Sequence, residues 1–532
     1  MILQTSISSS LQQQPNISPS TLLSRRTPPS ILHLPNRNPN DNSIITCSIS
    51  QVHCYGGTID YEKKSPLKWS SLYRRISLME NPDLGSSSVL NMWNKEGRKL
   101  SKWELCRVVR ELRKYRRYKL ALQVYQWMSD QRDKFTLYSS DIAIQLDLIA
   151  KVYGISAAEE YFLGLPDASK DKRTYGALLN AYVQAKMTEK AESLLIEMRK
   201  KSYDTHPLPF NVMMTLYMKL KEYEKVISMV SEMMEKNVPL DLYSYNIWLT
   251  TCGAMGSAAN MEEVLERMKE DSTVNPNWST YSTMASMYMK LGLAGKAEHC
   301  LKMVEGRITG RDRIPYHYLL SLYGNIGKKE EIYRIWNTYK SSFPNVPNLA
   351  YHSMIAALVR LDDIGGAEQI YEEWLTVKPT FDPRIYNLLM GWYVRNGMLQ
   401  KAEALLDQVF EGGGQANSIS YEILAEGHIK VKQIPEALSC MKEALTAERA
   451  KDWHWKPNPS IVSDILLLCE QKTDRDSKDA LMELLKQVGC LEDENYMSLI
   501  VTNDLGPKLS VEKDSTDDDG ADMLLNQLQG GL

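Results

Sequence analysis

The sequence lacks any cysteine pair of the kind that builds a disulfide framework or a zinc site. Its eight cysteines are scattered along 532 residues, with no CxxC motif and no cluster of fixed spacing. Such thiols are typical of buried side chains in a reducing compartment. The chain also lacks a run of about eighteen apolar residues, so we expect no membrane span.

Catalytic motifs are missing as well. None of the eight histidines belongs to an HxE sequence followed by CxxC, which is the arrangement of the zinc deaminases. There is no glycine-rich phosphate loop and no nucleophile elbow. We therefore expect no enzyme activity, no bound cofactor and no metal site.

Positive charge is not in excess. The 63 lysines and arginines are outnumbered by 66 aspartates and glutamates, and the formal net charge is −3. A protein that grips phosphate groups over its whole surface would be strongly basic. Any contact with nucleic acid must therefore use a local surface.

Acidic residues are absent from the first forty positions. This stretch is rich in Ser, Pro and Asn and carries Arg25, Arg26 and Arg37. The composition predicts an organelle transit peptide over residues 1–47, with cleavage near Cys47. Abundant Ser and sparse Arg favour a chloroplast, and a mitochondrion is the alternative. A disordered tail without a targeting role is the other interpretation.

What the sequence has in quantity is a repeat. One aromatic residue recurs every 35 residues, with a single interval of 36, as Tyr175, Phe210, Tyr245, Tyr281, Tyr316, Tyr351, Tyr386 and Tyr421. The eight units that place this residue at position 4 begin at Lys172, Pro207, Leu242, Trp278, Arg313, Asn348, Pro383 and Ser418. A fixed period of roughly 20 to 50 residues predicts units that bury their apolar faces against one another.

Each unit is predicted to contain two helices. In the unit from Trp278, apolar residues recur at helical spacing, Gly292 interrupts them, and the pattern resumes at Ala297. Glycine occupies position 15 of four units, where a helix can end in a left-handed residue, as Gly256, Gly292, Gly327 and Gly397. Alanine occupies position 20 of five units, where helices can approach closely, as Ala191, Ala297, Ala367, Ala402 and Ala437.

The array is predicted to extend beyond the eight regular units. Two imperfect units precede them from Lys102, and a closing helix pair follows from Pro459. We expect about ten units over residues 102–490. Residues 48–101 are predicted to be an N-terminal extension of mixed, partly helical character. Residues 491–532 are predicted to be an acidic, disordered C-terminal tail.

The unit resembles the pentatricopeptide repeat. The likeness rests on phrases such as Tyr386-Asn-Leu-Leu-Met-Gly-Trp-Tyr-Val-Arg-Asn-Gly397, followed by Lys401-Ala-Glu-Ala-Leu-Leu. The uniform unit length resembles the P class of the plant family. Tetratricopeptide repeats have a period of about 34 and a Trp, Leu-Gly and Tyr pattern that no unit here shows. The resemblance implies an all-α fold, a right-handed α-solenoid superhelix of stacked helix-turn-helix repeats.

The resemblance also implies that the fifth and last residues of a unit read one RNA base. Four units carry short polar side chains at both positions: Asn211 with Asp241, Asn246 with Asn277, Ser282 with Asp312, and Asn387 with Asn417. In this family these pairs imply uracil, a pyrimidine, guanine and a pyrimidine. Asn and Ser near a helix start are also common N-caps, so a purely structural role is the alternative.

Other units depart from this pattern or add to it. No clear base preference follows from Gly176 with His206, His317 with Pro347, His352 with Asp382, or Glu422 with Asn458. Position 2 wedges the base by the same resemblance, and apolar residues stand there as Leu208, Tyr243, Ile314, Leu349 and Ile419. Arg173 and Arg384 could stack there through their guanidinium planes.

Basic residues recur at position 13, the end of the predicted first helix. They are Lys219, Lys290, Arg360, Arg395 and Lys430, and stacking of the units would align them into a track for a phosphate backbone. A further group, here called the basic N-terminal cluster, comprises Arg107, Arg110, Arg113, Lys114, Arg116, Arg117 and Lys119. Solvated helix faces are the alternative for both groups.

The expected function is therefore sequence-selective binding of single-stranded organellar RNA. The protein would act in processing, stabilisation or translation by occupying a transcript, with processing or ribosomal proteins as further partners. The alternative is a helical-repeat scaffold for protein–protein interaction. Membership of a ribosome-associated assembly would combine the two.

Overall fold

The computed structural model describes residues 68–79, 84–131, 133–310, 312–377, 381–449, 455–491 and 493–504. In these residues the regular secondary structure is helical, without a strand. No helix among them is long and apolar enough to cross a membrane. The predicted transit peptide, residues 1–47, and residues 505–532 of the predicted tail lie outside the described residues.

The α-helices of the described residues follow the predicted units closely. They are α1 (Lys68–Ser77), α2 (Gly85–Lys95), α3 (Lys102–Lys114), α4 (Tyr118–Ser129), α5 (Ser139–Tyr153), α6 (Ile155–Leu163), α7 (Lys172–Gln184), α8 (Thr188–Lys200), α9 (Pro207–Lys219), α10 (Tyr223–Glu235), α11 (Leu242–Ala254), α12 (Ala258–Glu270), α13 (Trp278–Lys290), α14 (Ala294–Glu305), α15 (Ile314–Asn325), α16 (Lys329–Ser342), α17 (Asn348–Arg360), α18 (Ile364–Val377), α19 (Pro383–Arg395), α20 (Leu399–Glu411), α21 (Ser418–Lys430), α22 (Ile434–Arg449), α23 (Pro459–Lys472), α24 (Arg475–Gln487) and α25 (Glu494–Asp504).

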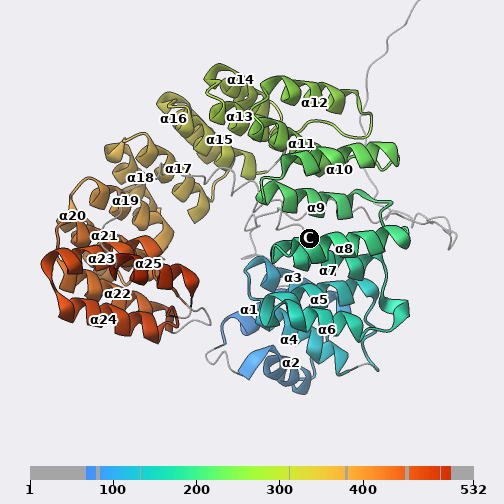
Figure 1. The fold of residues 1–532 in the computed structure, drawn as a ribbon, viewed down its shortest axis with the longest axis horizontal. Coiled ribbons are helices and arrows are strands. Elements are labelled where there is room, and N and C mark those ends of the chain that lie inside the picture. The colour runs from blue at the N-terminus through green and yellow to red at the C-terminus, as the bar shows by residue number, and fades with distance from the viewer. Residues whose placement is uncertain are drawn as a thin grey trace, which may run out of the picture. The chain divides into compact units, whose positions relative to one another are not determined.

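The helices pack as one pair for each unit (Figure 1). Within a unit the first helix packs on the second, as α7 does on α8 and α21 on α22. The first helix also packs on the first helix of the next unit, so that α5, α7, α9, α11, α13, α15, α17, α19, α21 and α23 form a continuous series. We call this series the first-helix row. The chain is thus an all-α solenoid of stacked helix-turn-helix units, as the repeat predicted.

One left-handed residue sets the turn inside every regular unit. The four predicted glycines at position 15 have φ of 82°, 72°, 75° and 74°. In the other four units the same position holds Lys186, Lys221, Asp362 and Lys432, with φ of 55°, 60°, 58° and 62°. A left-handed conformation costs a residue with a side chain about 1–2 kcal/mol. Packing of the two helices therefore outweighs the local preference at these four positions.

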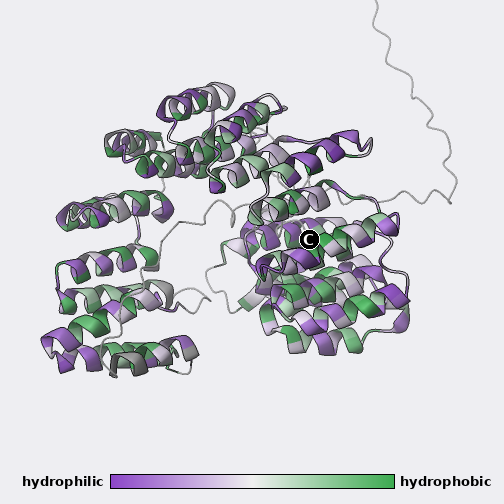
Figure 2. Ribbon diagram, turned by 45° about the horizontal axis from the view of Figure 1, so that its top comes forward, coloured by the Kyte–Doolittle hydropathy of each residue, from purple (hydrophilic) through white to green (hydrophobic). Residues whose placement is uncertain are grey.

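The core lies between the helices and consists of one large apolar cluster with a smaller cluster at each end. Seven of the eight position-4 aromatics are buried, and Tyr421 is half-buried. The position-20 alanines are fully buried, as are Met198, Met233 and Met268 of the second helices. Hydrophobic and hydrophilic residues both occur along the helices (Figure 2), and second helices such as α10 and α12 bury one apolar side.

A recurring polar contact also joins neighbouring units. A glutamate at position 21 accepts hydrogen bonds from a tyrosine at position 11 and a lysine at position 19 of the next unit. The instances are Glu192 with Tyr217 and Lys225, Glu262 with Tyr288 and Lys296, and Glu368 with Tyr393 and Lys401. Each lysine also lies over the tyrosine ring, with Nζ 5.0, 5.7 and 4.5 Å from the centroid. We call this arrangement the Tyr–Lys–Glu contact.

The N-terminal extension continues the helical packing. Helices α1 and α2 pack on α3 and α4, and Trp69, Leu72 and Trp93 are buried in the core that they share. Three large buried side chains thus give this short segment an apolar face, although its composition is mixed.

The prediction of a disordered tail from residue 491 is wrong for its first part. Residues Glu494–Asp504 form α25, which packs on α23. Tyr496 is buried, and its hydroxyl donates to the carbonyl oxygen of Pro457 at 2.5 Å. The acidic composition of the whole segment concealed this anchored aromatic and the half-buried Ile500 beside it.

Candidate nucleic-acid interface

The last residue of a unit is the N-cap of the next first helix in most units, and α15, whose N-cap is Arg313, is an exception. The side-chain oxygens of Asp241, Asn277 and Asn417 accept from backbone N–H groups in the first turn of α11, α13 and α21. Asp382 does the same for α19, and Asp312 accepts from the N–H of Ile314 at 3.0 Å. The capping role proposed as an alternative is therefore present at these positions, and it fixes each side chain at the start of the next helix.

Two of the four predicted reader pairs form the same closed network. Nδ2 of Asn211 donates to Oδ1 of Asp241 at 3.1 Å, and Oγ of Ser244 donates to Oδ1 of Asn211 at 2.8 Å. Nδ2 of Asn387 donates to Oδ1 of Asn417 at 3.1 Å, and Oγ of Ser420 donates to Oδ1 of Asn387 at 2.8 Å. Both fifth-position asparagines are buried. The sequence pattern did not include the two serines, although both stand at position 3 of their units.

Of the four units between these closed networks, those from Leu242 and Trp278 have incomplete networks. Nδ2 of Asn246 donates to Oγ of Ser279 at 3.1 Å, and Ser279 donates in turn to Asn277 at 3.0 Å. Oδ1 of Asn246 is buried and has no hydrogen-bond partner within the described residues. The same is true of Oγ of Ser282, and no hydrogen bond among the described residues joins Ser282 to Asp312. A buried polar atom without a partner costs about 1–3 kcal/mol, and neighbouring side chains among the described residues do not offset that cost at these two atoms as they do at Asn211 and Asn387.

In the units from Arg313 and Asn348, side chains at the predicted reader positions are buried or paired within the fold. His317 is 9% exposed, and burial together with Arg313 lowers its pKa to about 4, so its ring is neutral. Asp382 accepts from Nδ2 of Asn348 at 3.1 Å and from Nη2 of Arg384 at 2.7 Å. Burial raises the pKa of Asp382, but the hydrogen bonds and charge of Arg384 outweigh it and hold that pKa below its ordinary value. Neither unit offers an unoccupied polar edge to a base.

The position-2 side chains differ in how much of their surface they present. Ile419 is 52% exposed, whereas Leu208, Tyr243 and Leu349 are half-buried. Tyr243 is held by a hydrogen bond of 3.0 Å between its hydroxyl and Oγ1 of Thr215. Ile314 is 6% exposed and belongs to the core, so it presents little surface for stacking.

The position-13 cations are the last residues of their first helices. Lys219, Lys290, Arg360, Arg395 and Lys430 end α9, α13, α17, α19 and α21. Nζ of Lys430 donates to the carbonyl oxygen of Val394 in the preceding unit at 3.3 Å, which places adjacent members of the series side by side. Cations at helix C-termini are also favoured by the helix dipole. The series is interrupted at α11 and α15, which end in Ala254 and Asn325.

The C-terminal end of the first-helix row is acidic. Glu422 of α21 is half-buried and accepts from Nε1 of Trp455 at 2.9 Å. Burial raises the pKa of Glu422, of Glu426 one turn further along, and of Asp464 on α23. Carboxylates at this end disfavour a phosphate backbone, so the usable part of the row lies before Glu422.

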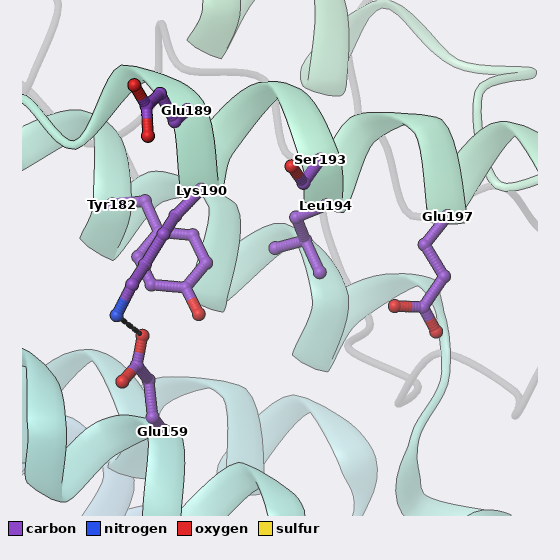
Figure 3. A pocket seen from close by; sticks show the side chains of 7 residues that line it. All are labelled: Glu159, Tyr182, Glu189, Lys190, Ser193, Leu194 and Glu197. Atoms are coloured by element: carbon purple, nitrogen blue, oxygen red, sulfur yellow. Dashed lines mark hydrogen bonds and ion pairs between the residues drawn. The ribbon is translucent and has the colours of Figure 1, made fainter.

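One hollow among the described residues lies at a contact between units. Figure 3 shows its lining, Glu159, Tyr182, Glu189, Lys190, Ser193, Leu194 and Glu197. Nζ of Lys190 reaches Glu159 across the hollow at 2.6 Å, beside the ring of Tyr182. This is the residue set of the Tyr–Lys–Glu contact, so we assign it to packing. Among the described residues no group of three or more His, Cys, Asp or Glu side chains is placed to hold a metal ion.

Comparison with known proteins finds the same repeat. The profile of the pentatricopeptide repeat domain matches residues 228–290, and that of the PPR repeat matches residues 173–203, 209–238, 279–307, 349–376 and 384–413. A pentatricopeptide repeat-containing protein of Arabidopsis thaliana is 56% identical over 488 residues, which are 92% of each chain.

Further similarities extend the comparison. The large ribosomal subunit protein mL101 (rPPR4) of Arabidopsis thaliana is 39% identical over 80% of this chain and 87% of its own. A mitochondrial pentatricopeptide repeat-containing protein of the same plant is 34% identical over 82% of this chain and 86% of its own. Among solved structures, that of PPR10 in complex with an 18-nt psaJ RNA element aligns with a TM-score of 0.26 at 15% identity, over 87% of this chain and 83% of that one.

Proposed function

Because the chain belongs to the pentatricopeptide repeat family, we propose that it binds single-stranded RNA and selects its sequence. The observation that supports this most directly is the state of two adjacent units, in which Oδ1 of Asn246 and Oγ of Ser282 are buried without a partner among the described residues. A base edge can supply the missing hydrogen bonds. The uniform unit length supports membership of the P class.

The preferred RNA follows from the order of the units. Read 5′ to 3′ from the unit at Lys172, the sequence is any base, U, a pyrimidine, G, two unread bases, a pyrimidine and any base. The two unread bases face the units closed by His317 and Asp382. Three consecutive read bases are few for unique recognition, so we propose that contacts with the phosphate backbone supply much of the affinity.

The action that fits these features is occupancy. We infer no catalytic step, because the sequence carries neither the zinc-deaminase arrangement nor a phosphate-binding loop or nucleophile elbow. A protein that occupies a transcript can shield an RNA end, hold a site open or recruit a processing enzyme. These outcomes differ only in where the target lies on the transcript.

The cellular compartment that we propose is an organelle. The composition of residues 1–47 favours the chloroplast. The relative that is 34% identical is named as mitochondrial, which favours the mitochondrion. Because that relative aligns with most of this chain, we take the mitochondrion as the working assignment. A fluorescent fusion of residues 1–60 imaged with markers for both organelles decides between them.

The test of base reading is crosslinking immunoprecipitation of the tagged protein from the isolated organelle, with sequencing of the bound RNA. A variant that replaces Asn211, Asn246, Ser282 and Asn387 by Ala serves as the comparison, and Asn337→Ala on the exposed side of α16 is the matched control. We expect a short footprint with U, pyrimidine and G in order, lost in the first variant and kept in the second. The same footprint in both variants would reject base reading.

A second candidate function is association with a ribosome. It is supported by the 39% identity to a protein named as part of the large ribosomal subunit. Sedimentation of organelle extract through a sucrose gradient tests it. Comigration with a ribosomal subunit that resists ribonuclease trimming of messenger RNA supports this role, and a peak at the position of free protein rejects it.

A further inference from the structure

The N-terminal helices carry a charge unlike that of the remainder. Residues 68–119 contain fourteen lysines and arginines and five aspartates and glutamates, a net charge of +9 in a chain whose total is −3. On α3, Trp103, Arg107, Arg110 and Lys114 are spaced by four, three and four residues, so they share one helix face. A strongly basic face thus lies beside the first-helix row.

Two large aromatic side chains on this surface are exposed. Trp103 is 62% exposed and Tyr138, just before α5, is 64% exposed. An exposed aromatic ring beside cations offers a face on which a nucleic-acid base can stack. The two residues are 35 positions apart, and Tyr138 is 35 positions before Arg173. They therefore continue the position-2 series toward the N-terminus.

Cations accompany both rings. Cζ of Arg107 lies 5.7 Å from the ring centroid of Trp103 and 5.3 Å from that of Trp69. Nζ of Lys102 lies 4.0 Å from the centroid of Tyr138 and 2.6 Å from Oδ2 of Asp141 on α5. The arrangement combines positive charge with open aromatic faces, which is how proteins hold single-stranded nucleic acid without reading it.

Some of these cations form ion pairs or hydrogen bonds within the fold of the described residues, and others do not. Arg113 pairs with Asp147 at 3.1 Å, and Arg117 donates to the carbonyl oxygen of Ser77 at 2.8 Å. Arg110 and Arg116 are exposed, and neither guanidinium group has an ion-pair or hydrogen-bond partner within the described part of the chain. These two groups remain available to phosphates.

We propose that α3 and the start of α5 form a second, sequence-independent contact for single-stranded RNA, 5′ to the base-reading units. Bases stack on Trp103 and Tyr138, and Arg107, Arg110 and Arg116 neutralise the adjoining phosphates. The inference rests on the proposed RNA-binding function and adds to it a contact outside the eight regular units. It also supplies affinity through the RNA backbone, which contacts with three adjacent bases do not provide.

The test uses the full chain and two RNAs in fluorescence anisotropy. The core RNA is 5′-AUUGAACA, which follows the predicted order, and the extended RNA adds four adenosines at the 5′ end. We expect the extension to tighten binding about tenfold, since stacking of one base contributes on the order of a tenfold gain or more. The double variant Trp103→Ala, Tyr138→Ala loses that gain and binds the core RNA as the unaltered protein does.

Two controls make the result specific. Phe410→Ala removes an aromatic side chain that is 44% exposed on α20, and it should keep the full gain from the extension. Four adenosines added at the 3′ end should change the affinity by the same factor in all variants. The double variant Arg110→Gln, Arg116→Gln should reduce the gain in affinity from the 5′ extension and should make that gain less dependent on salt concentration.

The outcomes separate this inference from the proposed function. If the core RNA binds but the 5′ extension adds nothing, or the double variant keeps the gain, the second contact is rejected. If the core RNA fails to bind while the extended RNA binds through Trp103, base reading is rejected and the second contact stands. Tighter binding of a duplex than of the single strand, or no binding of any RNA, would overturn the assignment of single-stranded RNA.

Discussion

Nδ2 of Asn211 donates to both carboxylate oxygens of Asp241, at 3.1 and 3.3 Å, across a unit boundary. The asparagine at the equivalent position of the next unit, Asn246, makes no such bond, and its Oδ1 is without a partner among the described residues. Equivalent positions of the repeat thus differ in what they can offer to a ligand. The difference separates positions whose polar atoms are paired within the fold from a position with an unpaired polar atom.

This difference predicts opposite effects for two similar substitutions. Asn246→Ala should weaken binding of the core RNA about tenfold, because a base loses one polar partner worth about 1–3 kcal/mol. Asn211→Ala should lower the melting temperature more than Asn246→Ala does, because Asp241 and Ser244 lose a buried partner. Anisotropy and thermal unfolding measured on the same samples check both. Equal effects of the two substitutions on affinity and stability would contradict the distinction.

The position-13 cations should control the salt dependence of binding. Each phosphate contact with a single strand contributes about −0.7 to the slope of log K against log salt. Replacing Arg360 and Arg395 together by Gln should therefore make the slope shallower by about 1.4 units. Affinity measured over a range of KCl concentrations gives the slope.

The matched control removes two exposed lysines from second helices, Lys200 and Lys442. It changes the net charge equally, and we expect no change of slope. An equal change in both double variants would mean that long-range charge attracts the RNA without a defined track along the first helices.

The Tyr–Lys–Glu contact should contribute stability that depends on pH. The hydrogen bond from Lys296 has the largest effect in lowering the pKa of Glu262, and the hydrogen bond from Tyr288 lowers it further. A carboxyl group whose pKa is lower in the folded state stabilises the fold above its unfolded pKa, about 4.5, and loses that contribution as the pH falls through the folded value. Because solvent screens this partly exposed pair, Glu262→Gln should cost only about 0.5–1 kcal/mol at pH 7, and less below about pH 4.

Thermal unfolding at a series of pH values from acid to neutral measures this effect. Glu263→Gln is the matched control, because it removes the same charge from the next position of α12. The Glu263 side chain is exposed and makes no hydrogen bond or ion pair with the described residues. We expect no pH-dependent difference for that variant. A loss of stability for Glu262→Gln that is the same at every pH would assign the effect to packing.

The left-handed residue at position 15 offers a test of the backbone alone. A Cβ added at Gly397, which has φ of 74°, would meet no atom within 4 Å. Gly397→Ala should therefore cost about 1–2 kcal/mol from backbone strain alone. Lys221→Gly, at φ of 60°, should be neutral or slightly stabilising, because relief of strain offsets the greater freedom of the unfolded chain. Chemical denaturation of both variants checks the opposite signs.

Glu422 should oppose folding at neutral pH. Burial raises its pKa, so the folded state favours the protonated form and stability rises as the pH falls through the folded value. Glu422→Gln keeps an acceptor for Nε1 of Trp455 and removes the charge. It should raise the melting temperature at neutral pH, with a smaller gain in mild acid. A constant gain across this range would contradict a role for ionisation.

The sequence by itself determined the period, the helix pairs and the family. The position-4 aromatics and position-15 glycines repeat because every unit meets identical neighbours, so local chemistry and packing agree. The same regularity placed the cations at the ends of the first helices, and the family resemblance implied the reader positions. Composition failed at the two flanks, where a few buried rings, Trp93 and Tyr496 among them, outweigh many polar residues.

Only the tertiary structure decided which reader positions are open. Asn211, Asn246 and Asn387 are the same residue at the same position. Oδ1 accepts from a serine of the next unit in Asn211 and Asn387, whereas Oδ1 of Asn246 has no partner among the described residues. Hydrogen bonds across unit boundaries depend on side-chain placement within about 3 Å, which a linear pattern does not encode. The exposure of Trp103 and Tyr138 was equally hidden, because whether an aromatic ring is buried depends on which helix lies over it.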